Sequence, residues 1–446
     1  MNVKVTTKCG QVQGVEEGVS VIFKGIPFAK PPVGNLRWKA PVPVEPWEGV
    51  YQADHFARIC PQTLAQEPNP YHKEFYADTA YIREMSEDCL YLNIWVPETA
   101  SPSDKLPVAF YIHGGGFGGG YSSEMEFDGQ AINRHGVIFV SIAYRLGVFG
   151  FLAHPWLTEE SEKGISGNYG IMDQIMALDW IYDNIEAFGG DPANITVYGQ
   201  SAGCMSTQVL VSSPLTEGRI AKAILQSGVS CKNPMLQAPS LEEGEEYGKA
   251  VVVNTGAAGL EELRDMDAAQ LLAAKNAFDA ECFKKYGFEG ALRIVPYVDG
   301  VILKKNVREI YKEGTMAKIP YMVGCVTEDL GTHKEDRCRR VPGLMLDECK
   351  AWAARQEETG NPPAYVYWFD HTLPGDGKPA WHSLELWYTM GTLHRSWRPM
   401  RQNDDDLSEE CVTYWTNFMK TGDPNGDSVP EWRPYLKKDG FIARLV

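Results

Sequence analysis

The sequence predicts an α/β fold with a central, mostly parallel, twisted sheet and helices on both faces. Short apolar runs rich in β-branched residues recur along the chain, and stretches with helical periodicity separate them. One such strand also turns into a helix at a glycine-rich pentapeptide. The 446 residues contain no internal repeat and no low-complexity linker, so we expect residues 1–446 to form a single domain.

In chain order, the N-terminal part is rich in glycine, proline and aromatic residues and predicts short strands. Residues 25–38 hold too many prolines for a helix, so we expect an extended segment at the surface. Further on, the pattern predicts strands at residues 87–97, 108–112, 137–142, 195–198, 223–226, 321–324 and 364–369. It predicts helices at residues 169–188 and 202–211, helical structure from 240 to 286, and a helix at 406–420. The last helix is expected to begin at an Asp406 cap, with Glu409 three residues later, and to end at Gly422.

A glycine-rich loop follows the strand at residues 108–112. Its sequence, His113-Gly114-Gly115-Gly116-Phe117-Gly118-Gly119-Gly120, allows two interpretations. Gly114 to Gly119 fits the G-x-G-x-x-G pattern of dinucleotide-binding loops, but no apolar-periodic helix begins at the last glycine. The other interpretation is an HGGG-type oxyanion loop, whose bare amides approach a carbonyl oxygen. We favour the oxyanion loop, because a nucleophile motif lies downstream.

That motif is Gly199-Gln200-Ser201-Ala202-Gly203, which fits the G-x-S-x-G nucleophile elbow. In such an elbow a strand turns sharply into a helix while the serine holds a strained backbone, so the flanking positions leave little room for a Cβ. Ser201 is then expected to project its hydroxyl above the sheet, and the amide of Ala202 to point at the same spot as an oxyanion donor. The pentapeptide alone also occurs by chance, as a serine in a glycine-rich turn.

Composition excludes several classes of function. The 42 basic and 59 acidic residues give a net charge of −17, which argues against nucleic acid or an anionic membrane as a partner. The N-terminus shows no signal peptide, and no apolar run approaches the ~18 residues that a membrane helix needs. The ten cysteines include no C-x-x-C pair, which predicts reduced thiols rather than a zinc site. We therefore expect a cytoplasmic protein with neither a cofactor nor a metal.

Longer motifs give the chain a more specific resemblance. They lie at residues 25–38, 87–93, 113–117, 168–170, 188–203 and 415–418, spread over nearly the whole length. With these motifs the chain resembles the type-B carboxylesterases, the α/β-hydrolase family that includes the cholinesterases. The resemblance implies an α/β-hydrolase fold and a serine hydrolase that cleaves small-molecule carboxylic esters through an acyl-enzyme.

The resemblance also implies a triad in the chain order serine, acid, histidine. Ser201 matches the nucleophile. The family's histidine lies after the last core strands and a few residues before a glutamate, as His382 does before Glu385. His371 directly follows a strand and is expected to make structural hydrogen bonds, and His394 lies in an expected helix, so His382 is the candidate base. The implied oxyanion donors are Gly115, Gly116 and Ala202, with Ser227 near the acid–histidine pair.

Two adjacent carboxylates compete for the role of the acid. Many relatives have a glycine, four residues and then the catalytic glutamate followed by glycine. Counted from Gly324, the fifth residue is Asp329, which favours Asp329 over Glu328. Leu330 stands where relatives have glycine, and a glycine comes one position late, so a slip by one residue stays open. Adjacent residues of an extended loop point in opposite directions, so only one of the two can face His382.

Departures from the family pattern bear on the substrate. Cholinesterases carry glutamate before the nucleophile, and Gln200 in its place argues against choline esters. About 34 residues separate Asp329 from residue 364, fewer than in larger relatives, which predicts a shallower or more open pocket. Exported relatives bridge cysteines at the positions of Cys60 and Cys89, so we expect these two thiols to be close together but reduced.

One alternative belongs to another class of function. Adhesion proteins of the neuroligin type share this fold but have lost the catalytic serine and act as binding ectodomains. The serine and the histidine are both present in this chain, which favours the enzyme.

Overall fold

Ten strands form the large sheet in the computed structural model, which describes residues 3–233, 237–287, 293–332 and 343–446. They are β3 (Val15–Glu17), β4 (Ser20–Pro27), β6 (Tyr91–Pro97), β7 (Leu106–Ile112), β8 (Ile138–Ile142), β9 (Gly190–Gln200), β10 (Lys222–Gln226), β11 (Tyr321–Val326), β12 (Tyr365–Phe369) and β13 (Ala443–Leu445). A second, small sheet consists of β1 (Lys4–Thr7), β2 (Gly10–Gln13) and β5 (Val50–Gln52).

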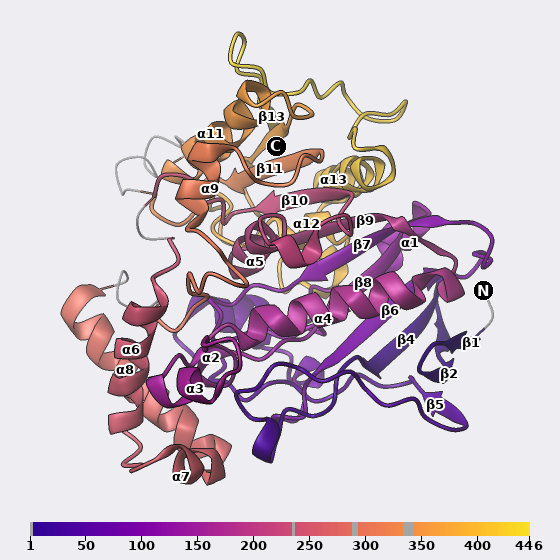
Figure 1. Ribbon diagram of the computed structural model, residues 1–446. Helices are drawn as coiled ribbons and strands as arrows, with labels where there is room; N and C mark the ends of the chain where they lie inside the picture. The colour runs from indigo at the N-terminus through magenta and orange to yellow at the C-terminus, as the bar shows by residue number, and fades with distance from the viewer. Residues whose placement is uncertain (1–2, 234–236, 288–292, 333–342) are drawn as a thin grey trace.

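The large sheet runs in the order β13-β12-β11-β10-β9-β7-β8-β6-β4-β3 (Figure 1). Neighbouring strands from β13 to β8 pair in parallel, and β6, β4 and β3 continue the sheet with antiparallel pairs. The sequence prediction of a mostly parallel sheet in an α/β fold is therefore confirmed.

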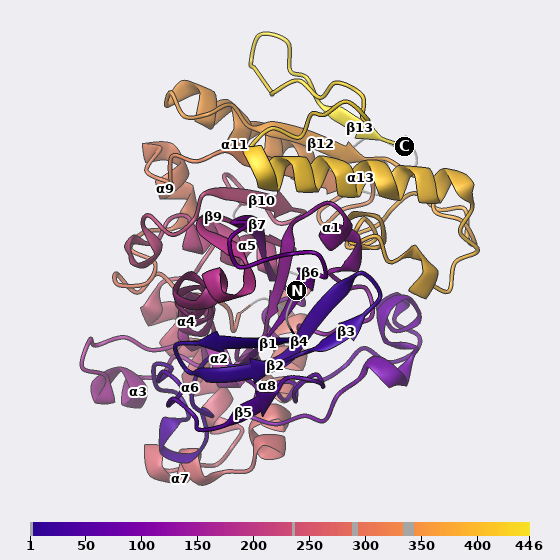
Figure 2. The same cartoon turned by 90° about the vertical axis from the view of Figure 1, so that its right-hand side faces the viewer.

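Helices connect the strands and cover the sheet. They are α1 (Gln130–Arg134), α2 (Gly147–Phe151), α3 (Pro155–Glu160), α4 (Tyr169–Asn184), α5 (Ala202–Leu210), α6 (Leu241–Val253), α7 (Leu260–Asp265), α8 (Ala268–Tyr286), α9 (Val307–Glu313), α11 (Leu344–Glu358), α12 (Leu386–Thr389) and α13 (Gln402–Thr421). Figures 1 and 2 show α4 and α13 on opposite faces of the sheet.

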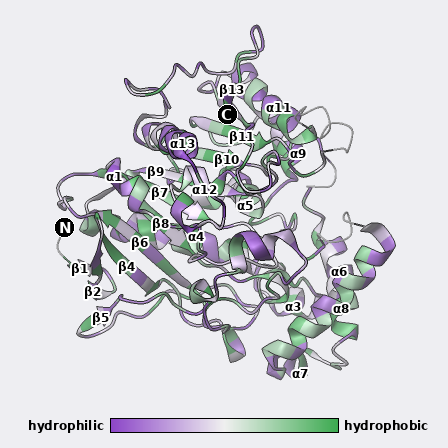
Figure 3. Cartoon of the chain, turned by 180° about the vertical axis from the view of Figure 1, so that it is seen from behind, coloured by the Kyte–Doolittle hydropathy of each residue, from purple (hydrophilic) through white to green (hydrophobic). Residues whose placement is uncertain are grey.

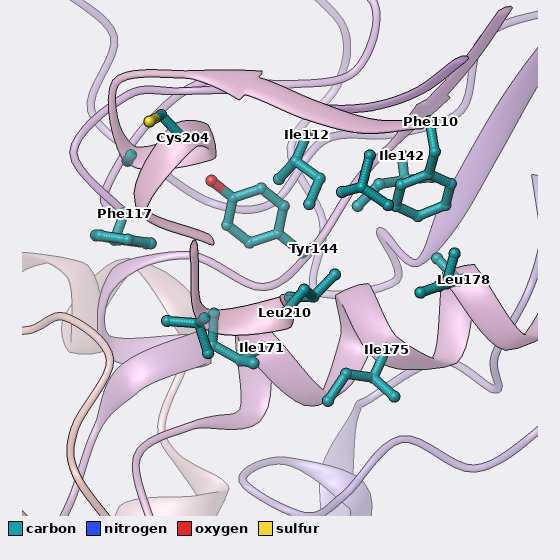
Figure 4. Close-up of a cluster of buried hydrophobic side chains, with 14 of the residues drawn as sticks. Phe110, Ile112, Phe117, Ile142, Tyr144, Ile171, Ile175, Leu178, Cys204 and Leu210 are labelled. Atoms are coloured by element: carbon teal, nitrogen blue, oxygen red, sulfur yellow. The ribbon is translucent and has the colours of Figure 1, made fainter. Parts of the chain in front are cut away.

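Strand β7 shows why both faces need a cover. Its side chains alternate, so Val108, Phe110 and Ile112 join the hydrophobic cluster under α4, whereas Ala109 and Tyr111 join the cluster under α13. Figure 4 shows part of the first cluster, with the side chains of α4 facing those of β7 and β8. Burying each large apolar side chain contributes roughly 1.5–3 kcal/mol, so these two layers hold the central strands in place.

Most of the predicted elements are confirmed, with corrections at the ends of the chain. Helix α13 begins at Gln402, four residues before the expected cap, because Asp404 rather than Asp406 accepts the backbone N–H of Arg401. Strand β13 was not predicted, since three residues give no pattern. The segment at 25–38 is not a surface segment throughout, because Phe28 and Trp38 are buried. The assignment of residues 1–446 to a single domain stays a prediction.

Helices α6, α7 and α8 project from the body of the molecule between β10 and β11 in the sequence (Figure 1). Hydrophilic and hydrophobic residues alternate along α8 (Figure 3). The helix buries Leu271, Ala274 and Phe278. Hydrogen bonds tie this group to the N-terminal part. The Arg37 guanidinium donates to the backbone oxygens of Arg264 and Met266 at the end of α7, and the Asn276 amide donates to the Thr63 hydroxyl at 2.9 Å.

Nine of the ten cysteines lie in the described residues and all nine are free thiols, while Cys338 lies outside them. Cys60 and Cys89 are both buried and lie within hydrogen-bonding distance of each other, so they are close together as predicted. The hydrogen bond with Cys60, together with burial, raises the pKa of the Cys89 thiol. Within the described ranges, no helix is long and apolar enough to cross a membrane.

Candidate active site

Four candidate site residues lie just beyond the ends of four neighbouring parallel strands. Ser201 follows β9, Ser227 follows β10, Asp329 lies three residues after β11, and His382 lies in the loop after β12. Because parallel strands present their carboxyl ends at one edge of the sheet, residues far apart in the sequence come together there. The sheet order β9-β10-β11-β12 thus places all three candidate triad residues along the same edge.

Ser201 lies at a sharp turn between β9 and α5. Its backbone has φ +57° and ψ −122°, a region in which a non-glycine residue is strained by about 1–3 kcal/mol. The turn is crowded, because a Cβ on Gly199 would lie 2.5 Å and a Cβ on Gly203 2.0 Å from the carbonyl oxygen of Ile112. The Ser201 N–H donates to the carbonyl oxygen of Gln226 on β10 at 2.9 Å. This geometry is that of a nucleophile elbow and accounts for both glycines of the motif.

Asp329 and His382 form a buried hydrogen-bonded pair. Nδ1 of His382 lies 2.6 Å from Oδ1 of Asp329, and the aspartate side chain is inaccessible to solvent. The backbone N–H groups of Val326 and Leu330 also donate to this carboxylate, at 3.2 Å and 2.7 Å. Because a carboxylate only accepts, Nδ1 carries the proton and Nε2 is left as an acceptor.

Glu328 takes a different position from its neighbour. Its backbone N–H donates to the carbonyl oxygen of Ala380 at 2.9 Å, which pairs the loop after β11 with the loop that carries His382. Its side chain is half-buried. The left-handed backbone that the loop needs lies at Gly331, with φ +77°. Of the two carboxylates, the geometry therefore brings Asp329 and not Glu328 to the imidazole.

Gln200 occupies the other side of the imidazole. Its side-chain nitrogen lies 3.3 Å from Nε2 of His382, and its side-chain oxygen accepts from the Ser383 hydroxyl at 3.1 Å. With Nε2 as an acceptor, the Gln200 amide donates to it. In this arrangement His382 lies between the candidate acid and the residue directly before Ser201. The sequence alone gave no signal for the contacts of Gln200 and Ser383.

A second buried acid, Glu385, lies behind the pair. The Ser227 hydroxyl donates to Oε1 of Glu385 at 3.0 Å, and Glu385 is fully buried. Burial, with the nearby charge of Asp329, raises the pKa of Glu385 to about 7. Ser227 therefore contacts Glu385, whose carboxyl group interacts with Asp329 and His382 through charge. In the sequence, Glu385 serves only to locate the histidine, and no pattern predicts that it is a buried acid.

The glycine loop packs against the elbow. A Cβ on Gly114 would lie 2.8 Å from the carbonyl oxygen of Gln200 and 3.2 Å from the Cβ of Ser201. Gly115 and Gly116 have φ of +102° and +62°, which glycine adopts without a steric penalty. Among the described residues, the N–H groups of Gly115, Gly116 and Ala202 donate to no acceptor. These three amides are therefore available to bind an oxyanion.

His113 supports the loop as a neutral residue. Burial lowers its pKa to about 4, and its ring stacks on Tyr144 with centroids 4.5 Å apart. The Tyr144 hydroxyl donates to the His113 carbonyl oxygen at 3.0 Å. No helix starts at the last glycine of the G-x-G-x-x-G pattern, since the next helix, α1, begins at Gln130. The loop thus lacks the helix N-terminus that a dinucleotide site requires.

The two rival candidates for the base, His371 and His394, lie in other elements. Nε2 of His371 lies 2.7 Å from Oδ1 of Asp404, a structural contact with α13 as expected. His394 lies in a 3₁₀ turn, Leu393–Arg395. In the part of the chain that the structure describes, no three His, Cys, Asp or Glu side chains gather in a way that could hold a metal ion.

Comparison with known proteins gives one consistent result. The sequence pattern of the "Carboxylesterase family" matches residues 2–341 and 344–445. A fumonisin B1 esterase of Sphingopyxis macrogoltabida is 39% identical over 98% of this chain and 85% of its own length. A para-nitrobenzyl esterase of Bacillus subtilis is 34% identical over 97% of this chain and 92% of its own length. Among solved structures, a PNB esterase superposes with a TM-score of 0.86 at 31% identity, covering 100% of this chain and 96% of that one.

Proposed function

The chain belongs to the carboxylesterase family and is an ester hydrolase of the α/β-hydrolase fold, and we propose that Ser201, His382 and Asp329 carry out its reaction by two-step acyl transfer. One observation carries the proposal. His382 is held between a buried carboxylate at 2.6 Å from Nδ1 and the residue that precedes a strained serine. An imidazole fixed in this tautomer is suited to take a proton from a neighbouring hydroxyl.

In the first step, the Ser201 hydroxyl displaces the Gln200 amide from Nε2 of His382 and attacks the ester carbonyl. Its proton moves to Nε2, and Asp329 stabilises the imidazolium that forms. The carbonyl oxygen becomes an oxyanion, which accepts hydrogen bonds from the N–H groups of Gly115, Gly116 and Ala202. Each such donor typically lowers the barrier by about 3–4 kcal/mol. The C–O bond to the leaving alcohol then breaks, and the alcohol takes the proton from Nε2.

In the second step, water takes the place of the alcohol. The water attacks the acyl-enzyme while His382 accepts a proton from it, and the same three amides bind the second oxyanion. The bond to the Ser201 oxygen then breaks, the proton returns to that oxygen, and the carboxylic acid departs. The cycle consumes one water and leaves the protein unchanged, so the chain's own residues supply every proton transfer.

Gln200 bears on the substrate. A neutral amide at this position adds no negative charge beside the nucleophile, and the contact with Ser383 fixes its orientation. Neutral esters therefore fit this side of the site better than esters of quaternary ammonium alcohols, which need an anionic or aromatic partner.

The proposal is tested by partitioning of the acyl group between water and methanol. Acetates of 4-nitrophenol, phenol and 2-naphthol are hydrolysed in the presence of methanol, and the ratio of methyl acetate to acetate is measured. Since all three esters form the same acetyl-enzyme, the ratio is expected to be identical for each. A ratio that changes with the leaving group would contradict a common acyl-enzyme. Loss of turnover with all three esters in Ser201→Ala assigns the acyl-enzyme to Ser201.

A further inference from the structure

An open pocket of about 340 Å³ lies over the glycine loop. Its floor includes Gly115 and Gly116, two of the candidate oxyanion donors, and its wall is one side of α8. A group bound in this pocket therefore contacts the loop that would hold the ester carbonyl.

Lys275 is the cation of this pocket. Its side chain crosses from α8 to the loop, since a Cβ on Gly118 would lie 3.2 Å from its Nζ and a Cβ on Gly147 3.2 Å from its Cε. Only 14% of the side chain is exposed, so the ammonium is pressed against bare backbone rather than spread into solvent. The glycines at these two positions make room for it.

The Lys275 ammonium is only partly satisfied. It has three N–H donors, and within the described ranges its ion pair is with Asp279 alone, at 2.5 Å. Nearby at the rim, the Thr63 hydroxyl accepts from Asn276 and so keeps its own proton to donate. The pocket thus offers N–H and O–H donors from Lys275 and Thr63. The Asp279 carboxylate accepts from the Lys275 ammonium and leaves its other N–H groups available.

Stabilisation of α8 does not explain where Lys275 lies. A lysine and an aspartate four residues apart on a helix stabilise it only slightly, and lysine before the acid is the weaker order. The same pair could form with both side chains in solvent. Instead the lysine is largely buried against Gly118, in the pocket that Gly115 and Gly116 also line, in a protein whose net charge of −17 repels anions.

We propose that this pocket is a binding subsite for a carboxylate carried by the ester substrate. This inference rests on the proposed esterase function and specifies its substrate class. The carboxylate accepts from the Lys275 ammonium and displaces Asp279 from part of it, while the scissile carbonyl lies at the glycine amides. The carboxylate can belong to the acyl part or to the alcohol part of the ester. The pocket adjoins the glycine amides that would bind the carbonyl oxygen, and both parts of the ester are attached to that carbonyl group.

Two matched ester pairs test the proposal. For a carboxylate in the acyl part, 4-nitrophenyl hemiglutarate is compared with 4-nitrophenyl pentanoate. For a carboxylate in the alcohol part, 4-acetoxybenzoate is compared with 4-methylphenyl acetate. In Lys275→Met we expect kcat/KM to fall at least tenfold for one anionic ester and to stay within about twofold for both neutral esters. Lys275→Arg should restore most of the loss, and Asp279→Asn should raise kcat/KM for the anionic ester.

The control is Lys284→Met, which makes the same change at an exposed position of the same helix, outside the pocket. Lys284→Met alters the net charge as much as Lys275→Met does. Because Lys284 lies outside the pocket, kcat/KM should stay unchanged for both ester pairs. If Lys284→Met lowers the anionic rates as much as Lys275→Met does, long-range charge and not a subsite is responsible. Equal changes in anionic and neutral esters, or no change in Lys275→Met, also overturn the proposal.

A binding experiment separates this inference from the proposed function. Calorimetry measures the affinity of free glutarate and of 4-hydroxybenzoate for the Ser201→Ala protein, with and without Lys275→Met. If the protein hydrolyses none of the test esters, at least tenfold weaker binding of one of these ligands in the double variant still supports the subsite. Unchanged binding of both would overturn it. Ester hydrolysis that survives in Ser201→Ala would instead refute the proposed function and leave the Lys275 result standing.

Discussion

Replacing Asp329 with asparagine removes one charge from the buried pair with almost no change in shape. The side chain accepts three donors, the imidazole and the N–H groups of Val326 and Leu330. If asparagine keeps its oxygen toward His382, its NH₂ group faces the Val326 N–H, and a donor meets a donor. If it turns over, its NH₂ group faces Nδ1, which forces the proton onto Nε2, where it blocks acceptance of the Ser201 proton.

Both orientations lower the rate by a calculable amount. In the first, the imidazolium loses an anionic partner, and opposite unit charges about 4 Å apart interact with about 4 kcal/mol at an effective dielectric constant of about 20. Since about 1.4 kcal/mol corresponds to a factor of ten, kcat falls by nearly 10³. In the second, the wrong tautomer brings the loss to about 10⁴. We therefore expect Asp329→Asn to lower kcat by about 10³ to 10⁴.

The assay is steady-state hydrolysis of 4-nitrophenyl acetate by the purified variants, with Glu328→Gln as the matched control. Glu328 contributes its backbone to the pairing with Ala380, so Glu328→Gln should keep kcat within about tenfold. Circular dichroism and Tm confirm that both variants are folded. The reverse pattern, with Glu328→Gln crippled and Asp329→Asn active, would refute the assignment of the acid.

Three further predictions concern stability and redox state. Asp173→Asn leaves the Arg145 guanidinium buried without its carboxylate. We therefore expect the free energy of unfolding, measured by heat or urea, to fall by about 3–5 kcal/mol. A fall of less than about 1 kcal/mol would contradict this. The pKa of Glu385 is raised from 4.5 to about 7, so its stabilising contribution is complete below pH 4.5 and is lost as pH rises through 7. When the pH is raised from 5 to 8, the free energy of unfolding of Glu385→Gln should therefore rise by about 3 kcal/mol relative to that of the parent. The same difference between the two proteins at both pH values would refute the buried acid. Thiol counting on freshly lysed, alkylated protein should find Cys60 and Cys89 both reduced, and a complete bridge would contradict a reducing compartment.

Local rules predicted those parts of the site that depend on neighbouring residues. The elbow was visible in the sequence because Gly199 and Gly203 have no space for a Cβ, so the pattern follows from sterics. Counting from Gly324 by the family's spacing pointed to Asp329, and the structure gives the physical reason for the displaced glycine. The left-handed turn lies at Gly331, which leaves the Leu330 N–H free to donate to the carboxylate.

Parts that depend on distant residues could not be predicted. Trp38 follows a proline-rich stretch that resembles a surface segment, yet its indole N–H donates to the carbonyl oxygen of Val148, 110 residues away. Strand β13 has three residues and exists because β12 offers a parallel edge. The contact of Gln200 with His382 depends on Ser383, which only the fold brings near.

The central claim is that Ser201 is the nucleophile. The most direct measurement is covalent labelling with a fluorophosphonate, followed by mass spectrometry of the digested protein. We expect one label per chain, on the peptide that contains Ser201, with activity lost in proportion to labelling and no label on the Ser201→Ala protein. A label on a different serine, or full esterase activity in Ser201→Ala, would contradict the account.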